Sequence, residues 1–119
     1  EFTVLRDAEL NVHAGVFIAR GAVISVHERV DIERDALVAE YVCIHDNNHR
    51  RSDPDRAIAE QGFDAAPIVI GEGSWIGAHA IILKGVTLGP NCVVGAGAVV
   101  TRSFPSHSTL VGVPARGRP

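Results

Sequence analysis

The densest group of polar side chains in the chain is the run IHDNNHRR, from Ile44 to Arg51. It holds two histidines four residues apart, His45 and His49, with a carboxylate and two amides between them. The unperturbed pKa of histidine lies near neutral pH, so an imidazole here can take a proton from a hydroxyl or an amine. We therefore expect acid–base chemistry in this segment. Asp46 and Asn48 are candidates for orienting the base or contacting a substrate, and each is equally suited to capping a turn.

Charge is distributed unevenly along the chain. All fourteen acidic residues lie at or before Glu72, whereas the stretch from Gly73 to Pro119 has four basic residues and no acid. The first stretch, with seven basic residues, therefore has a net charge of −7, and the second has +4. An end without acids favours an anionic ligand, although short loops low in carboxylates give the same pattern. Four scattered cations do not predict a nucleic-acid surface.

The sequence lacks the motifs of other common catalytic mechanisms. The sequence has no G-x-S-x-G elbow and no Walker loop. Cys43 and Cys92 form no CxxC pair, so we expect two core residues in a reducing, cytoplasmic setting. No apolar run approaches the roughly 20 residues of a membrane helix, and no signal peptide is visible. The chain opens Glu-Phe and contains no Met, which indicates a missing native N-terminal segment; its length predicts a single domain over 1–119.

The element that must position these residues is a repeat with a period of six. From Ile70 onward an aliphatic residue recurs at every sixth position, Gly usually follows it, and a small or branched residue comes four positions after it. The aliphatic positions are Ile70, Ile76, Ile82, Leu88, Val94 and Val100, and the small positions are Ser74, Ala80, Val86, Cys92 and Ala98. A helix has a period of 3.6, so this pattern does not fit one helical face.

Six residues suit one short strand and a corner. We expect the aliphatic residue to point inward, the Gly to supply unusual corner angles, and stacked coils to bury one another's faces. The same phase occurs upstream at Val12, Ile18, Ile24, Ile32, Val38 and Ile44, with two residues inserted between Ile24 and Ile32. The region 46–66 has no aliphatic period, so we predict a loop that leaves the coil there. Long loops on rigid scaffolds often carry function.

This pattern resembles the hexapeptide-repeat acyltransferases, over nearly the whole chain and most closely from Pro67 to Arg116. The resemblance implies an all-β fold, a single-stranded left-handed parallel β-helix with one extruded loop, and acetyl-CoA as co-substrate. That family places its essential histidine where the regular coils give way to the loop. Matched to the maltose, galactoside and polysaccharide O-acetyltransferase branch, this position is His49. It would act as general base while an acceptor hydroxyl attacks the thioester directly.

The same match implies contacts to the coenzyme. Trp75 would lie beside the pantetheine arm, backbone groups of Ala78 and Ala96 would bond its amides, and Thr101 with Arg102 would lie near the nucleotide. Arg116, in the segment GVPAR, would contact a phosphate, a role that suits the forked donors of arginine. A backbone N–H between Trp75 and Ala78 is a candidate oxyanion donor.

The resemblance also implies a homotrimer with active sites in clefts between subunits. We expect a sugar hydroxyl as acceptor, with an amine second, and no metal, nucleic acid or membrane partner. A rival on the same scaffold is a gamma-class carbonic anhydrase, which binds zinc with three histidines at a subunit interface. His45, His49 and His79 are available, but that family's GH…HGC-like stretch is missing. A second rival is a non-catalytic repeat module, against which the His49, Trp75 and GVPAR set argues.

Overall fold

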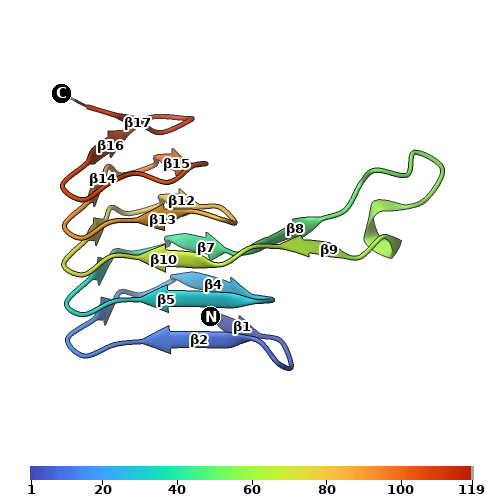
Figure 1. Cartoon of the computed structure of the whole chain (residues 1–119), viewed down its shortest axis with the longest axis horizontal. Helices are drawn as coiled ribbons and strands as arrows, with labels where there is room; N and C mark the ends of the chain where they lie inside the picture. The colour runs from blue at the N-terminus through green and yellow to red at the C-terminus, as the bar shows by residue number, and fades with distance from the viewer. Residues whose placement is uncertain (119) are drawn as a thin grey trace.

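The computed structural model describes residues 1–118, which wind into about five coils of a left-handed parallel β-helix (Figure 1). The chain passes once per coil through three sheets that form the sides of a prism. Sheet A contains β1 (Phe2–Val4), β4 (Val23–Val26), β7 (Cys43–His45), β12 (Ile81–Ile82) and β15 (Val99–Val100). Sheet B contains β2 (Glu9–Val12), β5 (Arg29–Ile32), β10 (Ile68–Ile70) and β13 (Thr87–Leu88). Sheet C contains β3 (Phe17–Ile18), β6 (Leu37–Val38), β11 (Trp75–Ile76), β14 (Val93–Val94), β16 (Thr109–Val111) and β17 (Arg116–Gly117).

The period of six sets the register between coils. In sheet A, Ile24 pairs with Ile44, Ile44 with Ile82, and Ile82 with Val100. These aliphatic residues point inward and are fully buried, as are their equivalents in sheets B and C from the second coil onward. In the first coil Val12 is 45 % exposed, because no coil covers it from below. The predicted inward phase is confirmed for every coil except this end coil.

Glycine has a different role at the corners from the one we expected. The Gly that follows an inward aliphatic residue has no positive φ; instead, a Cβ on Gly77 would lie 2.7 Å from the backbone nitrogen of Ala96 in the next coil. Positive φ occurs two residues later in the repeat, at Gly73 (70°) and at His79 (61°). The first Gly therefore permits close stacking of coils, and the left-handed corner residue is often not Gly.

The extruded segment leaves the coil between β7 and β10, as predicted, but its stem is regular (Figure 1). Strands β8 (Asn47–His49) and β9 (Phe63–Ala65) form an antiparallel hairpin, with the 3₁₀ turn η1 (Ile58–Glu60) toward its tip. Asp46, which we assigned to the loop, stays in the coil and is fully buried. The expectation for the cysteines holds for Cys92, which is buried, whereas Cys43 is only half-buried on the outer side of β7.

Candidate active site

His49 lies on the hairpin and packs against Phe63. The two residues face each other in the β8–β9 register, and their ring centroids are 4.4 Å apart with the planes tilted by 36°. The other contact of Phe63 is with His27, whose ring meets it edge-on at 4.5 Å. His27 belongs to the two inserted residues between β4 and β5, directly below the base of the hairpin. The aromatic ring of Phe63 therefore links two imidazoles from different coils.

Two hollows open beside His49. One, of about 500 Å³, is lined by Ser25, His27, His45, Asn47, Asn48, His49 and Phe63. The other, of about 670 Å³, lies toward the hairpin tip and is lined by Asn48, His49, Arg50, Arg51, Ser52, Asp64 and Lys84. The exposed His49 imidazole thus stands at the boundary of a mainly histidine- and amide-lined hollow and a basic one. A polar acceptor and an exposed base can meet here.

Asp46 lines neither of these hollows. Its carboxylate is fully buried and accepts hydrogen bonds from the backbone N–H groups of His27, Glu28 and Arg29, all at 2.8 Å. The side-chain amide of Asn47 donates a further bond to it at 3.0 Å. The sequence left three roles open for Asp46: orienting the base, contacting a substrate and capping a turn. This geometry supports the turn cap and argues against contact with a substrate, because the carboxylate is fully buried. Asn48 is exposed and remains available to a ligand.

Arg29 is fixed from the other side of the same turn. Its Nε donates to Asp31 at 2.8 Å, and Asp31 is almost fully buried. The hydrogen bond to Asp31 and the charge of that carboxylate raise the pKa of the Arg29 guanidinium. The backbone of the turn is therefore held by Asp46, and the Arg29 side chain at its end is held by Asp31 of the same strand, β5.

The predicted pantetheine residues come together in a groove on a different part of the prism. Trp75, Ala78 and Ala96 line it with Ala39, Glu40, Gly77, Val93, Val94 and Gly95, around a volume of about 480 Å³. It follows sheet C to the corner where the chain passes into sheet A, which we call the C–A corner. The Trp75 side chain is 53 % exposed and forms one wall.

Three backbone donors of this groove, the N–H groups of Glu40, Ala78 and Ala96, have no protein acceptor among the described residues. Trp75 and Gly77 each donate their N–H to the coil above, at 2.8 Å to Cys92 and Val94 respectively. Among the hydrogen bonds of residues 1–118, none uses the N–H of Ala78 or of Ala96. Ala96 is exposed and Ala78 is half-buried, so the N–H groups of these two residues are accessible to water or to a ligand's carbonyl oxygens.

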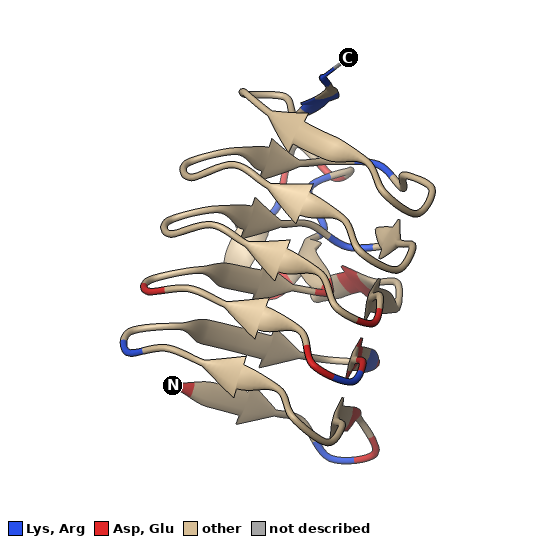
Figure 2. Cartoon of the chain, turned by 90° about the vertical axis from the view of Figure 1, so that its left-hand side faces the viewer, with Lys and Arg blue, Asp and Glu red and all other residues tan. Residues whose placement is uncertain are grey.

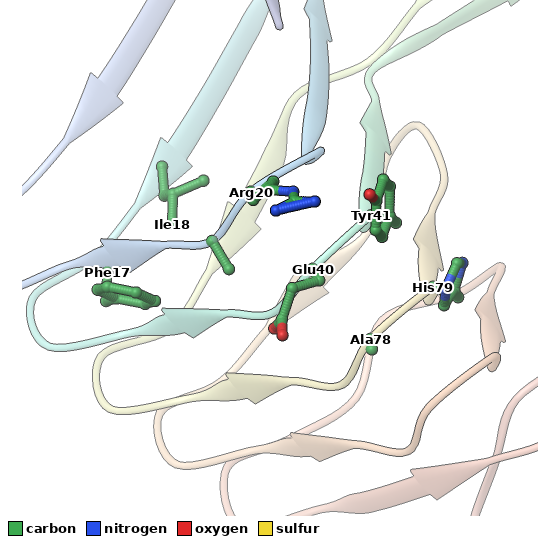
Figure 3. Close-up of a pocket in the computed structure, with 8 residues that line it drawn as sticks. Phe17, Ile18, Arg20, Glu40, Tyr41, Ala78 and His79 are labelled. Carbon is green, nitrogen blue, oxygen red and sulfur yellow. The ribbon is translucent and has the colours of Figure 1, made fainter.

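The groove continues toward the N-terminal coils as a larger hollow of about 700 Å³ (Figure 3). Glu40 and Ala78 line both, and Phe17, Arg20 and Tyr41 belong to the lower part. The rings of Tyr41 and His79 stack at the corner, with centroids 5.3 Å apart. His79 therefore lies on the C–A corner, whereas His45 and His49 lie at the hairpin. Among the described residues, no group of three His, Cys, Asp or Glu side chains is placed to hold a metal ion.

The predicted nucleotide contacts are exposed but not gathered at one point. Thr101 and Arg102 follow β15, at the corner between sheets A and B where the hairpin also emerges, and the Arg102 guanidinium lies 4.3 Å from the ring centroid of Phe104. Arg116 lies on β17 at the C-terminal edge of sheet C. The acid-free end of the sequence forms the C-terminal coils, and the charged residues on these coils themselves are all basic (Figure 2).

One chain therefore holds the site residues on two separate faces. His49, Asn48, Thr101 and Arg102 lie at the corner between sheets A and B, while Trp75, Ala78 and Ala96 lie along sheet C and the C–A corner. The hollows beside His49 share no lining residue with the Trp75 groove.

Sequence reasoning missed His27, Phe63 and Lys84. The two-residue insertion that breaks the repeat was a signal for His27, but the packing of Phe63 depends on hairpin register, which the sequence does not display.

Comparisons with known proteins support the six-residue repeat found in the sequence. Residues 67–102 match the family described as bacterial transferase hexapeptide (six repeats). A probable acetyltransferase of Mycobacterium tuberculosis is 37 % identical over 101 residues, covering 85 % of this chain and 34 % of the relative. WbbJ of Escherichia coli (strain K12), named as an O-acetyl transferase of lipopolysaccharide biosynthesis, is 36 % identical over 96 residues, 75 % of this chain and 49 % of the relative. The chain thus spans between a third and a half of these curated relatives.

Solved structures share the coil. A hexapeptide-repeat acetyltransferase of Vibrio cholerae complexed with acetyl-CoA superposes with a TM-score of 0.85 at 26 % identity, covering 98 % of this chain and 62 % of that one. A galactoside acetyltransferase in complex with coenzyme A gives 0.75 at 28 % identity, covering 99 % and 62 %. Within residues 1–118, no helix has the length and apolar character needed to cross a membrane. By its repeat pattern and its coiled structure, the chain is a hexapeptide-repeat domain related to the bacterial acetyltransferases.

Proposed function

We propose that this chain transfers an acetyl group from acetyl-CoA to a hydroxyl of a sugar, with His49 as general base. The observation that carries the proposal is the groove lined by Trp75, Ala78 and Ala96, in which the accessible backbone N–H groups of Ala78 and Ala96 have no protein partner. The relatives support the reaction class, since they are named acetyltransferases and two solved neighbours hold acetyl-CoA or coenzyme A.

The chemistry needs one proton acceptor and one oxyanion donor. The His49 imidazole takes the proton of the acceptor hydroxyl as its oxygen forms a bond to the acetyl carbonyl carbon. The carbon–sulfur bond then breaks, and the imidazolium returns the proton to the departing thiolate, which leaves as coenzyme A. Between Trp75 and Ala78, the N–H of Ala78 is the donor left free to receive the carbonyl oxygen during this step.

The coenzyme would run along sheet C with its nucleotide toward the C-terminal coils. Ala96, one coil above Ala78, offers the second free N–H for an amide of the pantetheine arm. Arg116 is one proposed contact of the phosphates, and the pair Thr101–Arg102, which shares the corner of His49, would contribute from a neighbouring copy. The absence of acids from Gly73 onward supports this direction, because no carboxylate of these coils opposes the phosphate charge.

A complete site would need a second copy of the chain. Because His49 and the Trp75 groove lie on separate faces, we propose a homotrimer in which the hairpin of one copy meets the groove of the next. Closed cyclic symmetry lets each of three identical clefts form in the same way. The exposed apolar side chains of Phe17 and Leu37, in register with Trp75 on the outer face of sheet C, support burial of this face between copies.

The acceptor is proposed from the hollow beside His49. It offers the Phe63 ring, imidazoles and amides, a combination that suits the apolar face and the hydroxyls of a sugar ring. A galactoside acetyltransferase and a maltose O-acetyltransferase are among the structural neighbours at 25 % identity or more. A cytoplasmic site of action is the setting in which the two free cysteines remain reduced.

Calorimetric titration with acetyl-CoA tests the proposal. Wild type should bind, Arg116→Ala should bind more weakly, and His49→Ala should bind as wild type while losing turnover with a sugar acceptor. Arg6→Ala, an exposed arginine of the first coil, is the matched control and should bind as wild type. No binding of acetyl-CoA by wild type at millimolar ligand would overturn the proposal.

A further inference from the structure

The buried carboxylate of Asp46 is the most heavily bonded side chain in the described part of the molecule, and the reaction outlined above does not use it. Its Oδ2 accepts from the N–H groups of Glu28 and Arg29, and its Oδ1 accepts from the N–H of His27 and the amide of Asn47. No arginine or lysine forms an ion pair with it among residues 1–118. Charge-assisted bonds to backbone N–H groups are what keep such a group tolerable inside a protein.

The backbone of Asp46 closes the base of the hairpin. Its carbonyl oxygen accepts from the N–H of Ala66 at 2.9 Å, just where β9 ends, and its own N–H donates to Ser25 in the coil below at 3.3 Å. One residue thus joins the start of β8, the end of β9 and the turn that follows β4. Asp46 therefore connects the hairpin, which carries His49, to the turn, which carries His27.

The hairpin and the turn are also in contact through the ring of Phe63. The His27 ring stands edge-on against Phe63 at 4.5 Å, and Phe63 lies against His49 at 4.4 Å. A movement of the turn at His27 therefore changes the support behind Phe63 and, through it, the orientation of His49. General-base catalysis is sensitive to such movement, since a misplacement of about 1 Å can lower a rate by about 100-fold.

We propose that Asp46 is a positioning residue for His49, acting through the 27–29 turn and the ring of Phe63. This inference rests on the proposed function, because it requires that His49 is the general base and that its orientation affects the rate. It replaces the expectation that Asp46 touches the acceptor. The negative charge of Asp46 matters because four N–H groups donate to its two side-chain oxygens. Only a carboxylate has two oxygens that can both accept.

Asp46→Asn is a sharp test because it keeps size and shape. Its single oxygen can still accept from Glu28 and Arg29, but its NH₂ group then faces the His27 N–H and the Asn47 amide, which are both donors. The turn should shift at His27. With the protein as a trimer, kcat should fall by about 100-fold while acetyl-CoA affinity stays within about twofold of wild type. Asp35→Asn, an exposed carboxylate at the corner between sheets B and C, should leave both values unchanged.

A double-mutant comparison separates positioning from general support of the fold. In a Phe63→Ala background the link to His49 is cut, so Asp46→Asn should lower kcat by no more than about threefold further. If its effect remains about 100-fold there, or if kcat and acetyl-CoA affinity fall together, Asp46 is only structural and the inference is overturned.

If Asp46→Asn does not fold, the partly exposed His27 serves instead. His27→Phe keeps an aromatic edge against Phe63 and should retain kcat within about threefold, whereas His27→Ala should lose about tenfold. Equal kcat for these two variants would overturn the inference. Wild-type protein that neither binds nor turns over acetyl-CoA would instead defeat the proposed function, so the two failures are distinguishable.

Discussion

The rings of His49 and Phe63 lie with centroids 4.4 Å apart, each contributed by one strand of the extruded hairpin. This contact leaves the imidazole exposed to a ligand while one of its sides is covered by an apolar surface. The hairpin register therefore decides which way the proposed base faces.

Removing the Phe63 ring should impair turnover more than stability. Phe63→Ala deletes both ring contacts, so His49 gains rotational freedom, and kcat should fall by about 100-fold with acetyl-CoA affinity unchanged. Because Phe63 is itself partly exposed, the free energy of unfolding should fall by only about 1 kcal/mol. Steady-state kinetics beside thermal unfolding measure both. A kcat equal to that of wild type would show that Phe63 does not orient the base.

Replacing the proposed base should remove the chemistry and spare binding. His49→Ala should lower kcat/KM for the acceptor by about 100- to 10,000-fold. Initial rates of both proteins with a sugar acceptor provide the measurement. A His49→Ala rate equal to that of wild type would point to another base, with His45 as the first to test.

The inward residues of the coil were predictable because they obey a strict spacing. Ile70, Ile82 and Val100 are buried where the period of six placed them, and the break in that period located the hairpin. The corner angles were not predictable in the same way, since Gly occurs at two phases of the hexapeptide for two different reasons. The two roles are distinguished only in the folded chain, by close approach of the next coil at Gly77 and by a positive φ at Gly73.

The residues of the candidate site could be proposed from the sequence, but their arrangement in space could not. The types and positions of His49, Trp75 and Arg116 were readable from motifs, whereas the separation of His49 from the groove follows from which corner each residue occupies. The support behind His49 depends on contacts between β8, β9 and the 27–29 turn. Those contacts join residues up to 36 positions apart, from His27 to Phe63, and leave no local spacing in the sequence.

The close stacking of coils at Gly77 should make the protein's stability sensitive to a side chain at this position. Gly77→Ala would place a Cβ 2.7 Å from both the nitrogen of Ala96 and the carbonyl oxygen of Val94, so the coils must separate. The free energy of unfolding should fall by about 1–3 kcal/mol. Gly117→Ala meets nothing within 4 Å and should stay within about 0.5 kcal/mol of wild type. Chemical denaturation compares them, and equal stability would mean that the spacing between coils adapts without cost.

Arg116 should contribute to coenzyme binding through phosphate. Arg116→Ala removes charge-assisted bonds, and the Kd of acetyl-CoA should rise by about 10- to 100-fold. The loss should shrink at high salt, because exposed charges are screened. Titrations of wild type and variant at two salt concentrations give the comparison. A variant that binds as tightly as wild type at low salt would move the phosphate site elsewhere, with Arg102 as the next candidate.

Mixed trimers should reveal that each site draws on two copies. His49→Ala lacks the base, and Ala96→Trp should block the groove, so each variant alone should be inactive. If His49 and the groove of one site belong to neighbouring copies, a randomly mixed 1:1 population regains intact sites where an Ala96→Trp copy supplies His49 and a His49→Ala copy supplies the groove. With each copy drawn independently around a closed ring, about one quarter of the sites should be intact. Co-purified mixtures carrying two different tags allow this activity to be assigned to mixed assemblies. Activity no higher than that of the single variants, in assemblies that carry both tags, would place His49 and its coenzyme groove on the same copy.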